Sequence, residues 1–249
     1  MSVDQVKQLA YQMRLYGIQA HLERRVAEAV SQSLHPLELL RLLLEDEILA
    51  RKDRVAKMLA SRGRFRSVAE LEDWDSTFDR GLTKQRFKEL ACLSFYHNQE
   101  NLILLGKTGE GKTHLAVALG RKLCAEGIRT TFLSVNMFFE ELAAARASGG
   151  YLKLIKQMTN SKVLILDDFA LRSYTHEEAT ALVDLLEDRY RRGVVIVTSQ
   201  VDPRGWSKLF DDPVIAEAII DRLSHPSQRL ALKGGSYRER LSARKPSSD

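Results

Sequence analysis

Hydrophobic residues recur at helical spacing throughout the first 66 positions of the chain. Val6, Leu9 and Met13 share one face of a predicted helix. Gly17 predicts the end of that helix, and a second apolar pattern continues to Val30.

A third helix is predicted from Pro36, since proline is well tolerated at the first helical position. Its leucine-rich pattern continues to Leu59, before Gly63. This part of the chain contains no strand pattern, so we expect residues 1–70 to form an all-helical N-terminal domain for interaction or DNA binding.

The pattern changes after about residue 75, where short apolar runs alternate with helical segments. Thr175 and Glu178 have the spacing of a capping box before one of these helices. Strands that alternate with helices predict a parallel sheet with right-handed crossovers. We therefore expect an α/β domain over 71–249 with five parallel strands, at residues 101–105, 130–135, 161–166, 194–198 and 229–232.

A complete G-x-x-x-x-G-K-[ST] motif follows the first strand and opens a helix, which is the context that a P-loop requires. Glycines let successive backbone N–H groups point at phosphate oxygens, and the helix N-terminus adds its positive dipole. The predicted ATP contacts are Gly106, Lys107, Thr108, Gly109, Glu110, Gly111, Lys112 and Thr113, with His114 directly after them. Lys112 can reach the β- and γ-phosphates, and Thr113 can bind Mg²⁺.

Two aspartates end the third predicted strand. Asp167 is expected at the carboxyl end of a buried strand, where it can bind the Mg²⁺ site. Asp168 can orient or deprotonate an attacking water. Both aspartates follow the P-loop at a spacing typical of nucleotide hydrolases.

The fourth strand also ends in polar residues. In a parallel sheet it can lie between the first and third strands, which would bring Thr198, Ser199 or Gln200 beside the γ-phosphate. The base-reading Asn/Thr-Lys-x-Asp motif of GTPases is missing from the sequence, and no arginine-bearing lid of a small-molecule kinase is evident.

The order of P-loop, Asp-Asp strand, Thr-Ser-Gln strand and late Asp221-Arg222-Leu223 resembles the AAA+ ATPases. Within them the chain is similar to the DnaC/IstB group, and specifically to IstB-type transposition helpers of bacterial insertion sequences. The sequence GKTGEGKTHL and the late Ser236-Tyr-Arg238 carry the likeness. It covers residues 70–240, and the helical N-terminal part more loosely.

The resemblance implies roles for several residues. Sensor 1 falls at Ser199 or Gln200, and Arg222 is the arginine finger that reaches the ATP of a neighbouring subunit. Arg238 is a candidate for sensor 2. Most AAA+ proteins have Glu where Asp168 stands, which predicts slow turnover. Seventeen residues after the last predicted strand predict a truncated or absent helical lid and a basic C-terminal tail.

Positive charge is concentrated in two segments. The 51–66 segment has seven basic side chains against one Asp, a net charge of +6, and the 233–249 tail adds +3 to a chain whose total is +5. Segregated positive charge is typical of phosphate-led DNA binding without direct sequence readout. The predicted DNA contacts are Arg51, Lys52, Arg54, Lys57, Arg62, Arg64 and Arg66, with Lys153 and Lys156 as a second group.

Composition excludes several other classes. Cys92 and Cys124 are too few for a disulfide framework, and the six histidines show no metal-ligand spacing with them. No apolar stretch approaches the roughly 20 residues of a membrane span. We expect a cytoplasmic protein in which Trp74 and Trp206 pack in the interior or at an interface rather than on a base.

Together these features predict an ATPase, with ATP and Mg²⁺ as cofactors, that oligomerises as a ring or helical filament on duplex DNA. The resemblance implies a transposase as its client. Two alternatives stay open: a DnaC-like replicative helicase loader, and a stand-alone P-loop kinase.

Overall fold

The computed structural model describes residues 2–190, 192–237 and 239–240. It divides into two compact units. The N-terminal unit contains Met1–Met58 and Ala125–Gly127, and the C-terminal unit contains Leu59–Cys124 and Ile128–Asp249. The helix α3 (Pro36–Arg62) contributes residues to both units. Among the described residues, the longest helices carry too many polar side chains to cross a membrane.

The N-terminal unit is helical, as the sequence predicts. Helix α1 (Val3–Gln12) begins with a capping box between Ser2 and Gln5. Helix α2 (Tyr16–Ser31) and the first part of α3 pack with α1 around a small core of four buried side chains. These side chains are Ala10, Ile18, Leu22 and Leu43.

Gly17 does not end a helix, contrary to our expectation. It lies in the first turn of α2, where a Cβ atom would come within 2.6 Å of the Asp46 carbonyl oxygen on α3. The glycine is therefore needed for close helix packing. Glu47 of α3 accepts hydrogen bonds from the backbone N–H groups of Gly17 (2.6 Å) and Ile18 (3.3 Å). It caps α2, whose own N-cap residue has no side-chain hydrogen bond.

The C-terminal unit contains a five-stranded, fully parallel sheet in the order β2-β3-β4-β1-β5. This confirms the predicted α/β fold and the place of the fourth strand between the first and third. The strands are β1 (Asn101–Leu105), β2 (Thr130–Ser134), β3 (Val163–Phe169), β4 (Val194–Ser199) and β5 (Ser227–Ala231). The third strand extends beyond its predicted end, through both aspartates.

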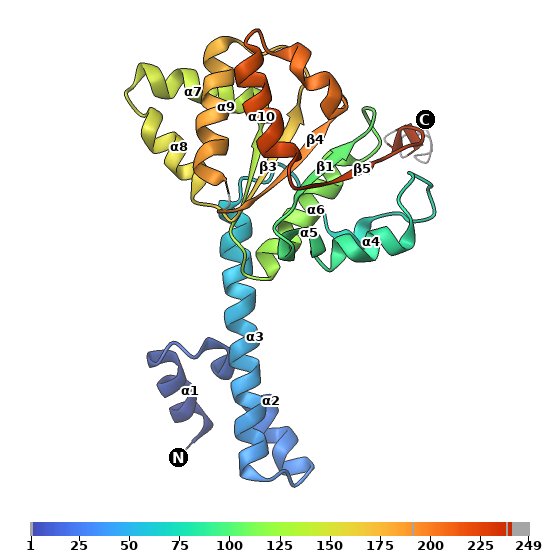
Figure 1. Ribbon diagram of the computed structural model, residues 1–249. Helices are drawn as coiled ribbons and strands as arrows, with labels where there is room; N and C mark the ends of the chain where they lie inside the picture. Colours follow the sequence, from blue (N-terminus) through green and yellow to red (C-terminus); the bar gives the residue numbers. More distant parts are fainter. Residues whose placement is uncertain (1, 191, 238, 241–249) are drawn as a thin grey trace, which may run out of the picture. The chain divides into compact units, whose positions relative to one another are not determined.

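Helices cover both faces of the sheet (Figure 1). Along β1 the side chains alternate, so Ile103 faces one layer while Leu102 and Leu104 face the other. The first layer contains α7 (Val135–Ala147), α8 (Tyr151–Thr159), α9 (His176–Arg189), α10 (Pro213–Ser224) and the 3-10 helix η2 (Pro203–Leu209). The second contains α4 (Lys84–Ala91), α5 (Ser94–His97), α6 (Lys112–Ala125) and the 3-10 helix η1 (Leu71–Asp73).

Both tryptophans are interior residues, as the sequence predicts. Trp206 is fully buried against Phe169, and Trp74 stacks on Phe87. The predicted capping box of α9 is also present, with Thr175 and Glu178 bonded reciprocally.

Candidate nucleotide site

The P-loop connects β1 to α6 at the carboxyl edge of the sheet (Figure 1). Gly109 and Gly111 have φ angles of +88° and +96°, a region that side-chain-bearing residues rarely adopt. The Lys112 side chain is buried and donates a hydrogen bond to the Lys107 carbonyl oxygen (2.9 Å). The loop thus forms the curled backbone that phosphate binding needs.

Glu110 supports this loop from within. Its side chain is buried, and its Oε2 accepts a hydrogen bond from the Lys107 backbone N–H at 2.5 Å. Thr108 on the outer side of the loop donates to Gln200 Oε1 (3.1 Å). Gln200 therefore contacts the P-loop from the end of β4.

Asp167 lies at the centre of a chain of hydroxyl hydrogen bonds. Its Oδ1 accepts from Thr113 Oγ1 at 2.9 Å and from Thr198 Oγ1 at 2.7 Å. Burial raises the pKa of this carboxyl, while the Thr198 and Thr113 hydrogen bonds lower it. The carboxyl ends of β3 and β4 and the start of α6 thus meet at one carboxylate.

This arrangement fits a hydrated Mg²⁺ ion. Mg²⁺ prefers oxygen ligands and is held by one or two carboxylates together with substrate phosphates and water. Thr113 and Asp167 supply a hydroxyl and a carboxylate at hydrogen-bonding distance. Within the described ranges, no group of three or more His, Cys, Asp or Glu side chains is arranged to hold a metal ion by itself.

Asp168 is held in an unusual backbone conformation. Its φ is +58°, and the β3–β4 pairing is irregular between Leu166 and Phe169, so the strand bulges at the aspartates. The Asp168 backbone N–H donates to Thr198 Oγ1 (3.0 Å). A bulge re-aims the side chain it carries, and Thr198 fixes it. The sequence analysis named Thr198 only as one of three polar residues that could lie beside the γ-phosphate, and did not predict its contacts with the two aspartates.

The two predicted sensor residues differ in their contacts. The Ser199 hydroxyl is buried and bonds to the backbone of Val201, accepting from its N–H (3.1 Å) and donating to its carbonyl (3.0 Å). Gln200 instead bonds to Thr108 of the P-loop. Gln200 thus contacts the nucleotide loop through its side chain, and Ser199 contacts it through its carbonyl oxygen, which accepts a hydrogen bond from the Gly106 N–H (3.3 Å).

A cluster of aromatic and cationic side chains packs behind the P-loop. The buried Arg80 guanidinium lies 3.3 Å from the Trp74 ring centroid and 4.7 Å from that of Tyr237. Desolvation lowers the pKa of Arg80 and of His114, whose ring lies 6.3 Å from Trp74. Sequence reasoning missed Arg80, because a single arginine in an irregular segment has no pattern.

The C-terminal tail reaches this cluster. The Tyr237 backbone N–H donates to the Gly109 carbonyl oxygen (3.0 Å), and the Lys233 N–H donates to the Arg80 carbonyl oxygen (2.8 Å). Residues 233–237 are therefore attached to the nucleotide loop. Arg238, the predicted sensor 2, lies outside the described residues, as does the end of the tail from 241.

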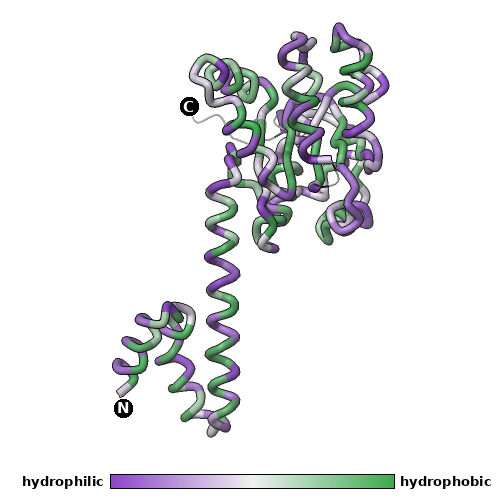
Figure 2. Tube along the Cα trace, turned by 60° about the vertical axis from the view of Figure 1, so that its left-hand side comes forward, coloured by the Kyte–Doolittle hydropathy of each residue, from purple (hydrophilic) through white to green (hydrophobic). Residues whose placement is uncertain are grey.

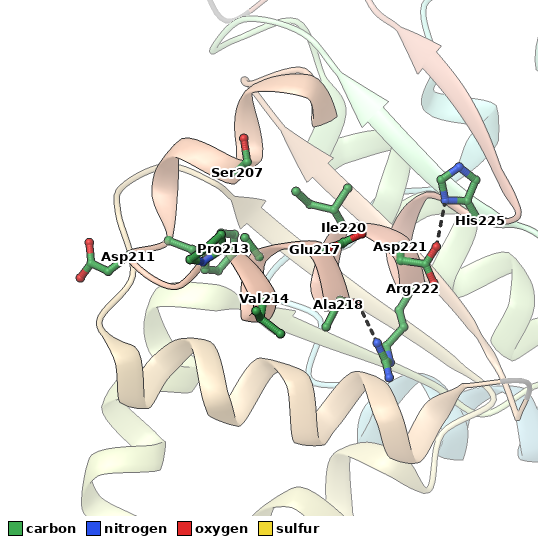
Figure 3. Close-up of a pocket in the computed structure, with 12 residues that line it drawn as sticks. Ser207, Asp211, Pro213, Val214, Glu217, Ala218, Ile220, Asp221, Arg222 and His225 are labelled. Carbon is green, nitrogen blue, oxygen red and sulfur yellow. Dashed lines mark hydrogen bonds and ion pairs between the residues drawn. The ribbon is translucent and has the colours of Figure 1, made fainter.

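Arg222 is far from the P-loop of its own subunit. Asn101, the first residue of β1, donates to the Arg222 carbonyl oxygen (2.8 Å), whereas the P-loop follows the last residue of that strand. At about 3.3 Å per residue, the five-residue strand separates the two places by roughly 13 Å. The side chain donates to the Ala218 carbonyl oxygen at 2.9 Å (Figure 3). It also pairs with Glu187 on α9. A surface cavity of about 950 Å³ borders this side chain.

The predicted DNA contacts fall in both units. In the N-terminal unit, Arg51 pairs with Glu47, Lys57 with Asp53, and Arg54 stacks on the Tyr16 ring. In the C-terminal unit, Arg62 and Arg64 line a surface pocket of about 460 Å³ together with Arg129, Thr130, Thr131, Gln157 and Leu59.

This pocket connects segments that are distant in the sequence. Gln157 belongs to α8, the helix that also carries the exposed Lys153 and Lys156. Arg64 additionally pairs with Glu141 on α7, and Arg66 contacts the Met137 sulfur. Arg129 was not among the predicted contacts, since it stands alone between a turn and a strand.

Comparison with known proteins agrees with this geometry. Residues 8–245 match the family model of the IstB-like ATP binding protein. A protein of insertion sequence IS21 from Pseudomonas aeruginosa is 34% identical over 236 residues, which cover 95% of this chain and 89% of the relative. An insertion-sequence protein of Mycobacterium tuberculosis is 35% identical over 229 residues, which cover 92% and 91%.

Solved structures share the fold. The DnaC helicase loader superposes with a TM-score of 0.55 at 22% identity, covering 66% of this chain and 97% of that one. DnaA from Aquifex aeolicus, solved with AMPPCP, gives 0.58 at 17% identity, covering 72% and 56%. Together with the family match over nearly its whole length, the P-loop and the parallel sheet establish that this chain belongs to the IstB-like ATP-binding proteins of insertion sequences.

Proposed function

We propose that this protein is a transposition helper that hydrolyses ATP, assembles on duplex DNA and recruits a transposase. The observation that carries the proposal is the hydrogen-bonded chain Thr113–Asp167–Thr198 at the base of the P-loop. It supports the proposal because a hydroxyl and a carboxylate of the kind that Mg²⁺ prefers lie together with a polar β4 residue at the base of the P-loop. The insertion-sequence relatives supply the biological setting.

In the proposed reaction the P-loop backbone and Lys112 bind the phosphates. Thr113 and Asp167 would hold Mg²⁺, which neutralises charge on the phosphate oxygens. Asp168 orients the attacking water and accepts its proton, while Gln200 lies beside the loop to contact the γ-phosphate. Asp168 is one methylene shorter than the glutamate at this position in most AAA+ proteins, so its carboxylate is held back from the water. We expect slow turnover that suits a timed switch.

Arg222 completes the site of the next subunit in this proposal. Its location at the opposite edge of the sheet from its own P-loop excludes a direct contact in cis. A contact from one edge to the other is head-to-tail, so it generates a ring or a helical filament. ATP binding then favours assembly, and hydrolysis favours release.

DNA is the proposed substrate of the assembled form. The pocket lined by Arg62, Arg64 and Arg129 has hydrogen-bond donors from three segments and no carboxylate in its lining. Such a surface suits a phosphate backbone and gives little sequence discrimination. The neighbouring Lys153 and Lys156 extend the same positive surface along α8.

Assembly in the presence of nucleotide and DNA tests this function. Sedimentation velocity and negative-stain imaging of the wild-type chain should show particles much larger than the ATP-free species only when ATP and duplex DNA are both present. Lys112→Ala should lose these particles. Arg204→Ala should keep them, because its side chain is 89% exposed and is not one of the proposed nucleotide, subunit or DNA contacts.

The partner protein distinguishes the two remaining functions, a transposition helper and a helicase loader. Capture of a transposase supports the helper function, and capture of a replicative helicase supports a loader. A particle that stays monomeric with ATP and DNA and phosphorylates a small molecule would contradict both.

A further inference from the structure

A groove on the surface of the C-terminal unit follows the helix α10. It has a volume of about 950 Å³ and extends from Ser207, before the helix, to His225, after it. We call it the α10 groove. Hydrophobic positions of this unit are concentrated in the strands of the sheet (Figure 2), yet Val214 in the groove is 74% exposed. Val214, Ala218 and Arg222 follow one another along the helix (Figure 3), so exposed apolar surface leads up to the proposed arginine finger.

The charged side chains that line the α10 groove are mainly acidic. Asp211, Glu217 and Asp221 are exposed, and among the described lining residues Arg222 is the only lysine or arginine. Apolar walls with exposed carboxylates suit a peptide segment that carries both apolar and basic side chains.

Residues 241–249 of this chain have that composition. Leu241 is their large apolar side chain, Arg244 and Lys245 are adjacent cations, and Asp249 is their one acidic residue. A segment of nine residues can span up to about 30 Å. The helix α10, with 12 residues, is about 18 Å long. The segment is therefore long enough to follow the groove.

The residues that precede this segment lie beside the P-loop of their own subunit. The Tyr237 backbone N–H donates to the Gly109 carbonyl oxygen (3.0 Å), and the Arg240 N–H donates to the Ser236 carbonyl oxygen (3.3 Å). In the proposed head-to-tail contact, Arg222 of one subunit reaches the P-loop of the next. The segment of that next subunit therefore begins close to Arg222 and to the groove beside it.

We propose that the α10 groove of one subunit binds residues 241–249 of the subunit whose ATP its Arg222 contacts. Leu241 packs among the apolar side chains of the groove, and Arg244 and Lys245 pair with its carboxylates. The inference rests on the proposed head-to-tail contact and adds a second attachment to it. Like the Arg222 contact it is heterologous, so it repeats along a ring or filament.

Charge reversal on each side tests the pairing. In sedimentation velocity with ATP and duplex DNA, Glu217→Arg should raise the protein concentration for half-maximal assembly about tenfold, because like charges then face each other. Arg244→Glu should have the same effect, and a chain with both changes should assemble within about twofold of wild type. Glu72→Arg is the matched control. Glu72 is also an exposed carboxylate, but it lies on η1 in the opposite layer of the sheet, so assembly should be unchanged.

Different results distinguish a failed groove contact from a failed head-to-tail contact. If the wild-type chain assembles, Arg222→Ala does not and Glu217→Arg matches wild type, the head-to-tail contact stands and the groove proposal is wrong. It is also wrong if the double variant assembles no better than the single ones. Stronger assembly of Glu217→Arg would show that the groove faces DNA phosphates instead. A wild-type chain that does not assemble overturns both proposals.

Disulfide crosslinking tests which subunit supplies the segment. In a Cys92→Ser background, which removes the exposed native thiol, Glu217→Cys and Arg244→Cys chains should crosslink when mixed and oxidised with ATP and DNA. Glu72→Cys and Arg244→Cys chains should not. If a chain with both Glu217→Cys and Arg244→Cys forms only an internal disulfide and the mixture does not crosslink, the groove binds the segment of its own subunit and the proposal is overturned.

Discussion

Asp167 is almost inaccessible to water, with 3% of its surface exposed. Burial favours the protonated acid, and the hydroxyls of Thr198 and Thr113 favour the carboxylate. The motif residues of this site were predictable because P-loops and Asp-Asp strand ends are short, local patterns. The contact between Thr198 and Asp167 was not predicted, although Thr198 was one of three candidates at the end of its strand, since this contact depends on two strands that are neighbours only in the folded sheet.

Removing the Thr198 hydroxyl should therefore weaken the site through Asp167. In Thr198→Val the pKa of Asp167 rises further, so the acid limb of the ATPase pH profile should move to higher pH and more Mg²⁺ should be needed for half-maximal activity. Thr198→Ser should restore both. A Thr198→Val profile that superimposes on wild type would show that the hydroxyl does not position Asp167.

Neutralising Asp167 should stabilise the protein while abolishing its activity. A raised folded-state pKa means that stability is lost as pH rises from the unfolded value, near 3.9, through the folded one. Asp167→Asn keeps an oxygen that accepts both hydroxyls, so its Tm at pH 8 without nucleotide should rise by about 3 °C. The gain should vanish below about pH 4, which thermal scans across pH would show. An unchanged or lower Tm at pH 8 would contradict it.

At the scale of elements, caps and periodicity located most of the fold correctly. The Thr175 capping box, the five strands and the three N-terminal helices are all present as the sequence predicts, although several of their ends differ. The short helices α4 and α5 gave no usable pattern, because eight and four residues hold too few turns to show periodicity. Gly17 misled the prediction, since a glycine that ends a helix and one that lets two helices touch look alike in sequence.

Gly17→Ala should separate these two explanations. The new methyl group would lie 2.6 Å from both the Asp46 carbonyl oxygen and the Glu47 Cα, which are backbone atoms. We expect the free energy of unfolding of the N-terminal unit to fall by about 2 kcal/mol, seen as early loss of helical circular dichroism on heating. A small gain in stability, as for a solvent-exposed helix position, would contradict the close approach.

For the molecule as a whole, the end of the basic segment 51–66 and the helix α8, which carries the second group of predicted DNA contacts, come together only after folding. Arg62 and Arg64 meet Arg129 and the α8 helix in a single pocket. The sequence showed that positive charge was concentrated, but it could not show which segments meet, because these lie on β2, α8 and the end of α3.

The salt dependence of DNA binding should report this pocket. Each lost phosphate contact reduces the slope of log K against log salt by about 0.9. In fluorescence anisotropy titrations with duplex DNA, Arg129→Ala should reduce this slope by about 0.9 per subunit. The reduction should be the same for DNA duplexes of unrelated sequence. Arg204→Ala should keep the wild-type slope. Equal slopes for both variants would place the DNA elsewhere.

Subunit complementation tests the central claim, that Arg222 acts on the ATP of a neighbour. Lys112→Ala retains the arginine but cannot use ATP, and Arg222→Ala retains the P-loop but lacks the arginine. Each variant should be inactive alone with duplex DNA. In an equal mixture, about a quarter of the sites combine an intact P-loop with an intact arginine from the neighbouring subunit, so the mixture should recover about a quarter of the wild-type ATPase activity. Full activity of Arg222→Ala alone, or a mixture that assembles on DNA and stays inactive, would contradict the account.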